Sequence, residues 1–504
     1  MRPIDRLYAS IARNPEAIAI SGADRGDVTY GELGVAVDAL AAAFQAIDLD
    51  AEGRIAICAP NTVEHLIALL ATYAAGKVWV PLNPRNGRAE LEAMLAATRP
   101  SIVVADAASL ARFTPRSAHV IISGASGGDA QPSIRGLIDA WTGKRPTRIE
   151  RTMEDAQIIK FSGGSTGVPK PVVQSLRCLN AQANGIRDFF EFCPDDVNLI
   201  AAPLTHGASC FVLPILEMGG RHVLLADTRA AAVLDVIARY GVTTMYAPPT
   251  LLYAVIDSPA ATSAVLDSLR HVIYSAAPMP PQRIRDCQRV LGPVIETAYG
   301  QVEAPQIIAG MRANELLIEE NLASVGRPSS VATIEIMGAD GSLRPAGEVG
   351  EIVVAGPLLM SGYLDRPEET ARTIIDGWLH TGDLGMIDDR GYLFIRGRLR
   401  EVINSGGFKV FPAEVEASLA RHPAVVECTV FGLEDPKWGE AVHAAVVLHH
   451  GIAVADDDLI AWVKAELGSV KAPKRIWRVE HLERNAAGKV SRAGVRKSLS
   501  AALI

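Results

Sequence analysis

The sequence predicts an α/β protein, in which helices and strands alternate in layers, with a smaller α+β unit at its C-terminal end. The first observation is an alternation of helical patterns, whose apolar residues recur every three to four positions, with short apolar runs typical of strands. The helical patterns lie at 31–45, 63–76, 230–241 and 280–292, and the strand-like runs lie at 54–60, 77–82, 222–227, 243–248 and 271–277. Because turn residues bound these apolar runs, we expect strands buried on both faces.

The second observation is a change of pattern after about residue 330. Closely spaced strand and turn signals at 332–357 and 391–398 indicate an antiparallel or β-barrel-like portion. Beyond Arg398, two helical patterns and two strand-like runs predict an α+β domain of about 100 residues, an ordinary domain size. Residues 401–504 hold 13 basic and 13 acidic residues, so the net charge of −8 lies in the first 400. We therefore predict domains at 1–399 and 400–504.

Composition excludes several classes of protein. The 504 residues are 49% hydrophobic and 21% charged with a net charge of −8, and a general nucleic-acid binder would need a basic surplus. The longest apolar stretch, Leu66 to Gly76, is shorter than a membrane span, and the N-terminus lacks the pattern of a secretory signal. The six cysteines lie singly, which favours buried free thiols over disulfides or a zinc site. We expect a cytoplasmic protein.

One segment has the composition of a phosphate-binding loop. Residues 159–171 read IKFSGGSTGVPKP, an apolar lead-in followed by glycines, hydroxyls and a lysine. Glycines let backbone N–H groups converge on one point, while the hydroxyls and the lysine add donors and charge. The segment is not a Walker A loop, because Val168 and Pro169 separate the last glycine from Lys170. By itself such a turn is more often an ordinary surface loop.

Six further segments change that interpretation. They are SAAPMP (275–280), AYGQVEA (298–304), GWLHTGDLG (377–385), IRGRLREVINSGGFKVFPAEVE (395–416), EDPKWGEAV (434–442) and NAAGKVSR (485–492). In this order and at these distances the chain resembles the adenylate-forming superfamily, which contains acyl- and aryl-CoA synthetases, peptide-synthetase adenylation domains and firefly luciferase. The resemblance implies a large N-terminal domain and a small, mobile C-terminal domain joined at a hinge.

The resemblance also implies which residues meet ATP. In this superfamily a carboxylate attacks the α-phosphate of ATP, and because both groups are anions, cations must neutralise and align them. Glu303 matches the ligand of Mg²⁺, a cation that takes oxygen ligands, and Asp383 matches the carboxylate that accepts the ribose hydroxyls. The expected catalytic residues are Lys489, Glu303, Thr166 and His206, with Glu303 as the metal ligand. The expected ATP and AMP contacts are Ser162, Gly163, Gly164, Ser165, Thr166, Gly167, Lys170, Ala276, Ala277, Tyr299, Gly300, Gln301, Asp383, Arg398 and Lys489.

Other matches concern the acyl pocket, the hinge and CoA. His206, in PLTHGAS, matches a residue at the edge of the acyl pocket, and Arg400 falls at the hinge, about which the family rotates its C-terminal domain between half-reactions. Gly407 matches a glycine that lines the pantetheine tunnel, where a side chain would block the thiol. The expected acyl-pocket residues are His206, Gly207, Ala277 and Gly300. The expected CoA-binding residues are Gly407, Trp438, Lys474 and Arg85.

Three positions depart from the family pattern. Gly163 stands where Ser is usual, and Pro171 stands where Gly is common. Val302 replaces a Thr whose hydroxyl touches the α-phosphate, and Val donates no hydrogen bond.

The resemblance therefore predicts an ATP-dependent acid–thiol ligase. A carboxylic acid and ATP, with Mg²⁺, give acyl-AMP and pyrophosphate, and CoA then gives acyl-CoA and AMP. Two alternatives stay open, a stand-alone adenylation enzyme that loads a carrier protein and a non-catalytic nucleotide-binding relative. Residues 178–192 offer Asp188 alone to bind an α-ammonium, which favours an acid other than an amino acid. Retention of Lys489, Glu303 and Asp383 argues against a non-catalytic relative, and the similarity is greatest to aryl- and short or medium acyl-CoA ligases.

Overall fold

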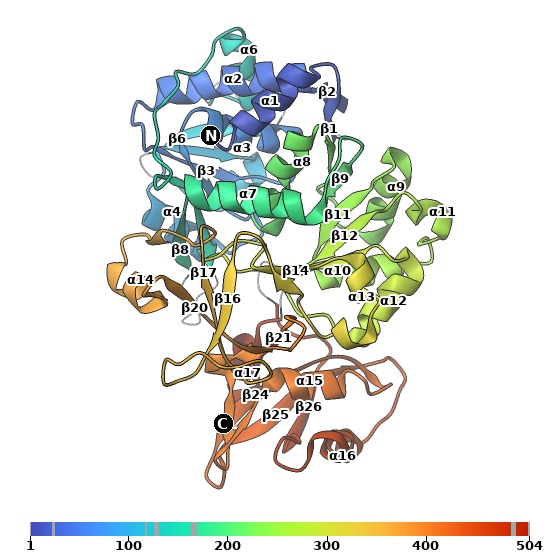
Figure 1. Ribbon diagram of the computed structural model, residues 1–504. Coiled ribbons are helices and arrows are strands. Elements are labelled where there is room, and N and C mark those ends of the chain that lie inside the picture. The colour runs from blue at the N-terminus through green and yellow to red at the C-terminus, as the bar shows by residue number, and fades with distance from the viewer. Residues whose placement is uncertain are drawn as a thin grey trace.

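The largest sheet is parallel through its centre, as the apolar strand-like runs predict (Figure 1). The computed structural model describes residues 2–22, 26–115, 118–124, 131–162, 169–484 and 490–501. In it, nine strands follow the order β15-β14-β13-β12-β11-β9-β10-β1-β2, and those from β1 to β13 in this order run parallel. The strands are β1 (Ile18–Gly22), β2 (Gly26–Thr29), β9 (Val197–Ile200), β10 (Arg221–Leu224), β11 (Thr244–Ala247), β12 (His271–Tyr274), β13 (Ile295–Tyr299), β14 (Ala309–Met311) and β15 (Arg327–Pro328).

A second sheet of seven strands follows the order β18-β8-β7-β4-β3-β5-β6. Its strands are β3 (Arg54–Cys58), β4 (Val78–Pro81), β5 (Ile102–Ala105), β6 (His119–Ile122), β7 (Ala156–Ser162), β8 (Lys170–Ser175) and β18 (Gly362–Tyr363). Strands β3 to β7 are parallel, whereas β7 and β8 form an antiparallel pair in which Ser162 stands opposite Lys170. The predicted phosphate loop therefore connects two neighbouring strands.

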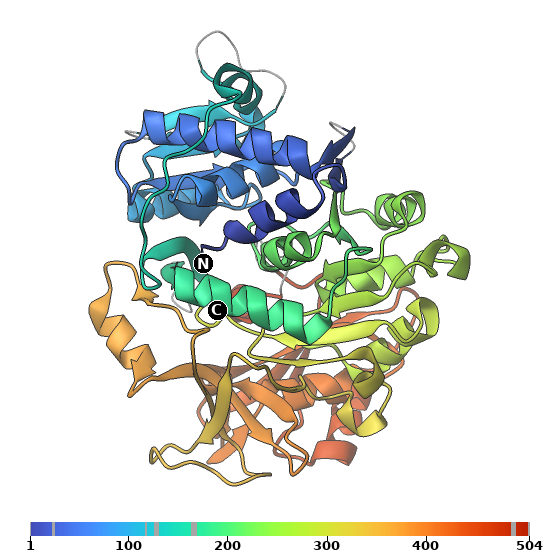
Figure 2. The ribbon, with the colours of Figure 1, turned by 45° about the horizontal axis from the view of Figure 1, so that its top comes forward.

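Helices fill the space between and around these sheets. They are α1 (Asp5–Arg13), α2 (Tyr30–Ile47), α3 (Val63–Ala74), α4 (Arg88–Thr98), α5 (Ala107–Leu110), α6 (Ile134–Trp141), α7 (Leu176–Phe190), α8 (Val212–Met218), α9 (Ala230–Tyr240), α10 (Pro249–Ile256), α11 (Ser263–Leu266), α12 (Pro281–Leu291) and α13 (Ala313–Leu316), with 3₁₀ turns η1 (Gly207–Phe211) and η2 (Glu319–Asn321). Every residue of α3 is buried, and α3, α7 and α8 share one apolar core with strands of both sheets. Figure 2 shows α7, in green, crossing the middle of the molecule.

The antiparallel portion expected after residue 330 is a separate five-stranded sheet. Its strands are β16 (Thr333–Met337), β17 (Gly350–Ala355), β19 (Ile374–Ile375), β20 (Trp378–Ile387) and β21 (Leu393–Arg398), with α14 (Pro367–Thr373) beside it. All of its pairs are antiparallel. In the β20–β21 hairpin Asp383 stands opposite Arg398, so the register alone brings two predicted site residues together.

The C-terminal residues form an α+β unit with an apolar core of their own. Its elements are η3 (Leu399–Glu401), β22 (Ile403–Ser405), β23 (Phe408–Val410), α15 (Pro412–Leu419), β24 (Val425–Asp435), β25 (Gly439–Leu448), α16 (Asp456–Leu467), β26 (Arg475–Arg478) and α17 (Arg492–Ala501). Figure 1 shows these elements together at the bottom of the molecule, in orange and red. A small C-terminal α+β domain is confirmed, and its start at residue 400 stays a prediction.

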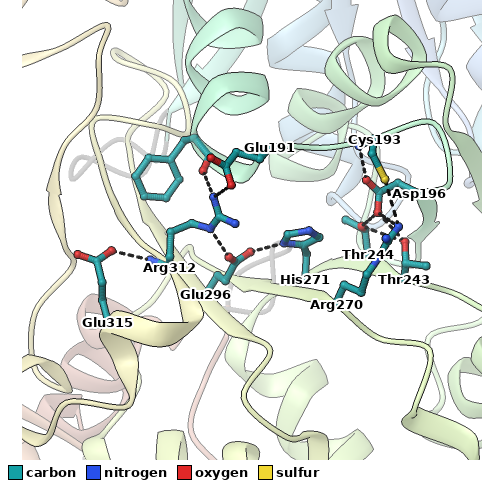
Figure 3. Close-up of polar contacts among 11 residues, drawn as sticks. Glu191, Cys193, Asp196, Thr243, Thr244, Arg270, His271, Glu296, Arg312 and Glu315 are labelled. Atoms are coloured by element: carbon teal, nitrogen blue, oxygen red, sulfur yellow. Dashed lines mark hydrogen bonds and ion pairs between the residues drawn. The ribbon is translucent and has the colours of Figure 1, made fainter.

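A polar network holds the first residues of β12 and β13 (Figure 3). The buried Glu296 carboxylate lies 2.9 Å from Nδ1 of His271 and accepts a hydrogen bond from Nε of Arg312 at 2.8 Å. Arg312 also donates to the carbonyl of Phe189 at 2.7 Å and to Glu191 at 3.0 Å, at the end of α7. These contacts fix the two strands from the edge opposite to the one that carries the predicted site residues.

Two sequence expectations concern cysteines and membranes. All six cysteines are free thiols, as predicted, and four of them are buried, whereas Cys193 and Cys428 are partly exposed. Cys428, on β24, packs against the core of the C-terminal domain, and its Sγ lies 3.5 Å from the carbonyl of Glu416. Within the part of the chain that the structure describes, no helix combines the length and apolarity that a membrane crossing needs.

Candidate active site

The candidate site lies at one edge of the nine-stranded sheet. Parallel strands place their carboxyl ends at a common edge, and open α/β sheets bind ligands in the crevice outside that edge. At this edge β12 leads into residues 275–277, β13 leads into residues 300–303, and β9 leads into the segment that carries His206. Three of the segments singled out by sequence therefore meet at the place where the fold favours a ligand.

Asp383 on β20 is the centre of a hydrogen-bonded cluster beside this edge. Its buried carboxylate accepts hydrogen bonds on Oδ2 from the Tyr299 hydroxyl at 2.7 Å and the Gln301 amide at 2.6 Å. Nε of Arg398 lies 2.9 Å from Oδ1. Burial and the neighbouring carboxylate raise the pKa of Tyr299 well above its ordinary value, so the phenol keeps its proton and donates. The structure thus brings these predicted ATP-binding residues into direct contact.

The backbone around the cluster is constrained at two positions. Ala276 has a φ of +78° and is exposed, a strained conformation that persists only where the surroundings fix it and that is common at functional sites. A Cβ added to Gly300 would lie 2.4 Å from the backbone nitrogen of Gln306, so only glycine fits there. Ala277, next to Ala276, is half-buried, so small residues follow β12 and β13 at this edge.

Glu303 and Lys170 are joined through a segment that the sequence had not singled out. The Tyr363 hydroxyl donates to Oε1 of Glu303 at 2.9 Å, and no hydrogen bond from the described residues reaches Oε2. Lys170 pairs with Glu369 and its ammonium lies 5.2 Å from the centre of the Tyr363 ring. A hydrogen bond from Lys170 lowers the pKa of Glu369. Lys170 is thus held on a carboxylate beside Tyr363.

The predicted acyl pocket has a tightly packed wall. His206 is exposed, and its Nδ1 lies 2.8 Å from the Thr205 hydroxyl. A Cβ on Gly207 would lie 2.4 Å from the hydroxyl of Tyr246, and the Tyr246 ring stacks on Phe211 with 5.3 Å between centres. Because Tyr246 is buried and held by that stacking, a larger residue at Gly207 would displace it.

Three of the predicted CoA-binding residues lie in one cluster of the C-terminal domain. The Trp438 ring packs on Gly406, where an added Cβ would lie 2.9 Å from the ring, and the Lys474 ammonium lies 5.6 Å from the ring centre. Gly407 has a φ of +84°, which favours glycine, although a Cβ there would meet nothing within 4 Å in this arrangement. Arg85 is exposed in the loop after β4 and stands apart from this cluster.

The chain on either side of residue 489 is anchored near the predicted hinge. Arg484 and Val490 form an antiparallel bridge, and Arg492 donates to both oxygens of Glu416 at 2.8 and 3.0 Å and also pairs with Glu401. Glu401 follows Arg400, which is exposed in η3. The predicted site residues Gly163, Gly164, Ser165, Thr166, Gly167 and Lys489 lie outside the described residues.

Sequence reasoning missed several side chains that the structure places at the site. Tyr363 and Glu369 contact Glu303 and Lys170 from a segment about 200 residues beyond the phosphate loop, and nothing in their local pattern points to that contact. Lys160 is different, because it is a charged residue inside the apolar run of β7. A single charge in a buried strand is a signal that the sequence alone contains, although the pattern of residues 159–171 predicts only an apolar lead-in to the loop.

The fold and the site define a two-domain α/β protein with a polar cluster at the carboxyl edge of parallel strands, the arrangement of a nucleotide site. The model of the AMP-binding enzyme family matches residues 7–364, and that of the AMP-binding enzyme C-terminal domain matches residues 414–489. The chain belongs to the AMP-binding enzyme family.

Individual relatives agree with this assignment. The chain is 34% identical over 475 residues to a feruloyl-CoA synthase of Amycolatopsis sp., covering 93% of this chain and 94% of the relative. Among solved structures, ATP-bound MatB from Rhodopseudomonas palustris is 28% identical with a TM-score of 0.90 and 99% of both chains covered. The amide bond synthetase McbA from Marinactinospora thermotolerans is 30% identical with a TM-score of 0.89, covering 99% of this chain and 100% of that one.

Proposed function

We propose that this chain is an AMP-forming acid–CoA ligase. It joins a carboxylic acid to ATP, releases pyrophosphate, and passes the acyl group from the adenylate to CoA. The observation that carries the proposal is the contact of Asp383 with Tyr299, Gln301 and Arg398 at the carboxyl edge of the sheet. The similarity to a feruloyl-CoA synthase over nearly the whole chain supports CoA as the acceptor.

In the first half-reaction the Asp383 cluster holds the nucleoside. Its carboxylate accepts the ribose hydroxyls, while Tyr299 and the small residues at 276 and 277 border the adenine. Lys170 leaves Glu369 for the phosphates, and the exchange is inexpensive because both side chains are partly exposed. Lys489 binds beside the reacting carboxylate and the α-phosphate, so that these two anions face a cation when they meet.

Glu303 fits a magnesium site completed by substrate. Mg²⁺ is commonly held by one or two carboxylates together with phosphate oxygens and water, and Tyr363 leaves one oxygen of Glu303 available. Within the described residues no group of three or more ligating side chains could hold a metal without such help. When bound with ATP, the ion would neutralise phosphate charge as pyrophosphate leaves.

In the second half-reaction the C-terminal cluster receives CoA. Trp438 offers an aromatic face, Lys474 offers a charge for a phosphate, and Gly407 leaves room for a narrow chain beside them. We propose that rotation about Arg400 brings this cluster to the acyl-adenylate. We also propose a cytoplasmic location, where ATP and CoA are available.

Exchange of labelled pyrophosphate into ATP tests the first half-reaction directly. Aryl, short-chain and medium-chain carboxylic acids are offered one at a time with Mg²⁺, and at least one should support exchange. The active acid is then offered with CoA, a carrier-protein thiol or an amine, and the product is identified by mass. Formation of acyl-CoA supports the proposal. Absence of exchange with every acid would instead indicate a non-catalytic relative, and amide or carrier-bound product without acyl-CoA would contradict CoA as the acceptor.

A further inference from the structure

A lysine is buried beside the predicted acyl pocket without an acidic partner. Lys160 on β7 is 7% exposed. Its ammonium lies 3.0 Å from Oγ of Ser209 and 3.3 Å from the carbonyl of His206, and 5.5 Å from the centre of the Trp79 ring. No Asp or Glu of the described residues pairs with it. Burying an ammonium without a counter-charge costs several kcal/mol, so this lysine calls for an explanation.

Lys160 also lines a small cavity whose wall is mostly apolar and to which Lys160, Gln182 and Ser209 contribute polar side chains. The cavity measures about 10 Å³ and lies between β7, α3, α7 and η1. Gln182 of α7, 2% exposed, donates from Nε2 to Sγ of Cys210 at 3.2 Å, and the Lys160 ammonium lies 3.9 Å from the same sulfur. A thiol sulfur is a weak hydrogen-bond acceptor. The Gln182 amide and the Lys160 ammonium are strong donors, so the Cys210 sulfur is a poor acceptor for both.

The cavity adjoins the acyl pocket through one short turn. Ser209 and Cys210, which form its wall, follow His206 and Gly207 in η1, and Ser209 donates to the carbonyl of His206 at 2.9 Å. His206 is exposed whereas Cys210 is buried, so this turn runs from the protein surface, at the predicted acyl pocket, to the cavity in the interior. A volume of about 10 Å³ admits about one water molecule or one ligand oxygen group, and not an alkyl chain.

We propose that Lys160 and Gln182 form the far end of the acyl pocket and select a carboxylic acid that carries a second oxygen group, preferably an anionic one, remote from its reacting carboxylate. The inference rests on the proposed ligase function and assigns the substrate class of that site. An anionic oxygen of the substrate would supply the negative counter-charge that the Lys160 ammonium lacks. It would also accept a hydrogen bond from the Gln182 amide in place of the Cys210 sulfur. An apolar terminus would leave the charge of Lys160 without a counter-charge and the Gln182 amide on the weak Cys210 acceptor, which discriminates against such an acid.

Matched acids that differ only at the far end test the selection. Alkanedioic acids are compared with alkanoic acids of equal carbon number, and 4-carboxy and 4-hydroxy benzoic and cinnamic acids with their 4-methyl counterparts. The measured quantity is kcat/KM for pyrophosphate exchange. In the wild-type protein the oxygen-bearing acid should exceed its apolar counterpart at least tenfold in one or more pairs. Lys160→Met should lower that ratio at least tenfold while kcat/KM for the apolar acid changes less than threefold.

The melting temperature and a control substitution at a second buried lysine distinguish selection of the acid from a purely structural role of Lys160. Lys77 is also buried, but it pairs with Asp48, so Lys77→Met should lower the melting temperature and leave the acid preference unchanged. Lys160→Met should keep or raise the melting temperature, since an unpaired buried charge is removed. A preference that survives Lys160→Met, or an equal loss with both acids of a pair, would overturn the inference and leave the cavity to a water molecule. Exchange with no acid at all would instead overturn the ligase function, and the inference with it.

Discussion

Replacing Asp383 by Asn should weaken ATP binding while leaving the fold intact. Two donors converge on Oδ2 of Asp383, and Arg398 faces Oδ1. In the Asn variant one oxygen becomes an amide donor, so either Arg398 or the Tyr299 and Gln301 pair meets a donor instead of an acceptor. The variant also loses the charge that the ribose hydroxyls would meet.

The size of the effect follows from the bonds that change. A hydrogen bond to a charged group is worth about 1.5–3 kcal/mol, and losing one such bond corresponds to roughly a 10- to 150-fold weaker affinity. We expect KM for ATP in pyrophosphate exchange, and the Kd for ATP in calorimetry, to rise by that factor. Because Arg398 is half exposed, water compensates for its lost partner and the melting temperature should change little.

Asp388 offers a matched control on the same β20–β21 hairpin. Its carboxylate accepts a hydrogen bond from the backbone nitrogen of Tyr392 at 2.8 Å and pairs with Arg390 at the turn. Asp388→Asn should therefore keep KM for ATP within twofold of the wild-type value. A folded Asp383→Asn variant with KM within threefold would refute the ribose contact and reduce Asp383 to a partner of Arg398 in the hairpin. An equal rise of KM for ATP in both variants would indicate that a disturbed β20–β21 hairpin, and not the lost Asp383 carboxylate, weakens ATP binding.

The remaining predictions address catalysis, the acyl pocket and acid stability. Lys489→Ala should slow adenylation by about 10³, or about 4 kcal/mol, yet spare thioester formation from supplied acyl-AMP; equal losses in the two half-reactions would contradict that role. Gly207→Ala should lower stability by about 1–3 kcal/mol and raise KM for the acid, because the new Cβ meets Tyr246; denaturation and acid titration measure both, and unchanged values would show that Tyr246 moves freely. Burial lowers the pKa of His65 from 6.5 to about 4, so the unfolded chain binds the proton more strongly and the free energy of unfolding should fall by about 3 kcal/mol between pH 6.5 and 4. Denaturant titrations at several pH values should show a smaller fall in His65→Gln, and identical slopes would exclude His65 as the source.

Much of the fold could be predicted from local sequence patterns because the central strands are apolar on both faces. The runs at 54–60, 77–82 and 243–248 became β3, β4 and β11, all of them parallel and buried. The change of sequence pattern after about residue 330 marks the start of an antiparallel sheet, which a small C-terminal α+β domain follows. In each case burial and turn chemistry act over a few residues, which is the range that a sequence pattern reports.

The site could be predicted only where it depends on neighbours in the chain or on the family pattern. Contacts such as Tyr363 with Glu303 and Lys170 with Glu369 join residues that the sheets bring together from distant segments, and no local signal encodes them. Lys160 gave a local signal, but its significance depends on Ser209 and Gln182, which line the same cavity from other elements. The roles of the predicted residues, the hinge and the boundary at residue 400 stay predictions.

The contacts of Arg492 have a consequence for the proposed alternation of the two half-reactions. Arg492, the first residue of α17, binds Glu416 on α15 and Glu401 next to the predicted hinge. The start of α17 is therefore tied to the C-terminal domain at two points. In the proposed rotation about Arg400 we expect α17 and the Trp438 cluster to move together, so that departure of Lys489 from the site and arrival of Trp438 would be a single movement.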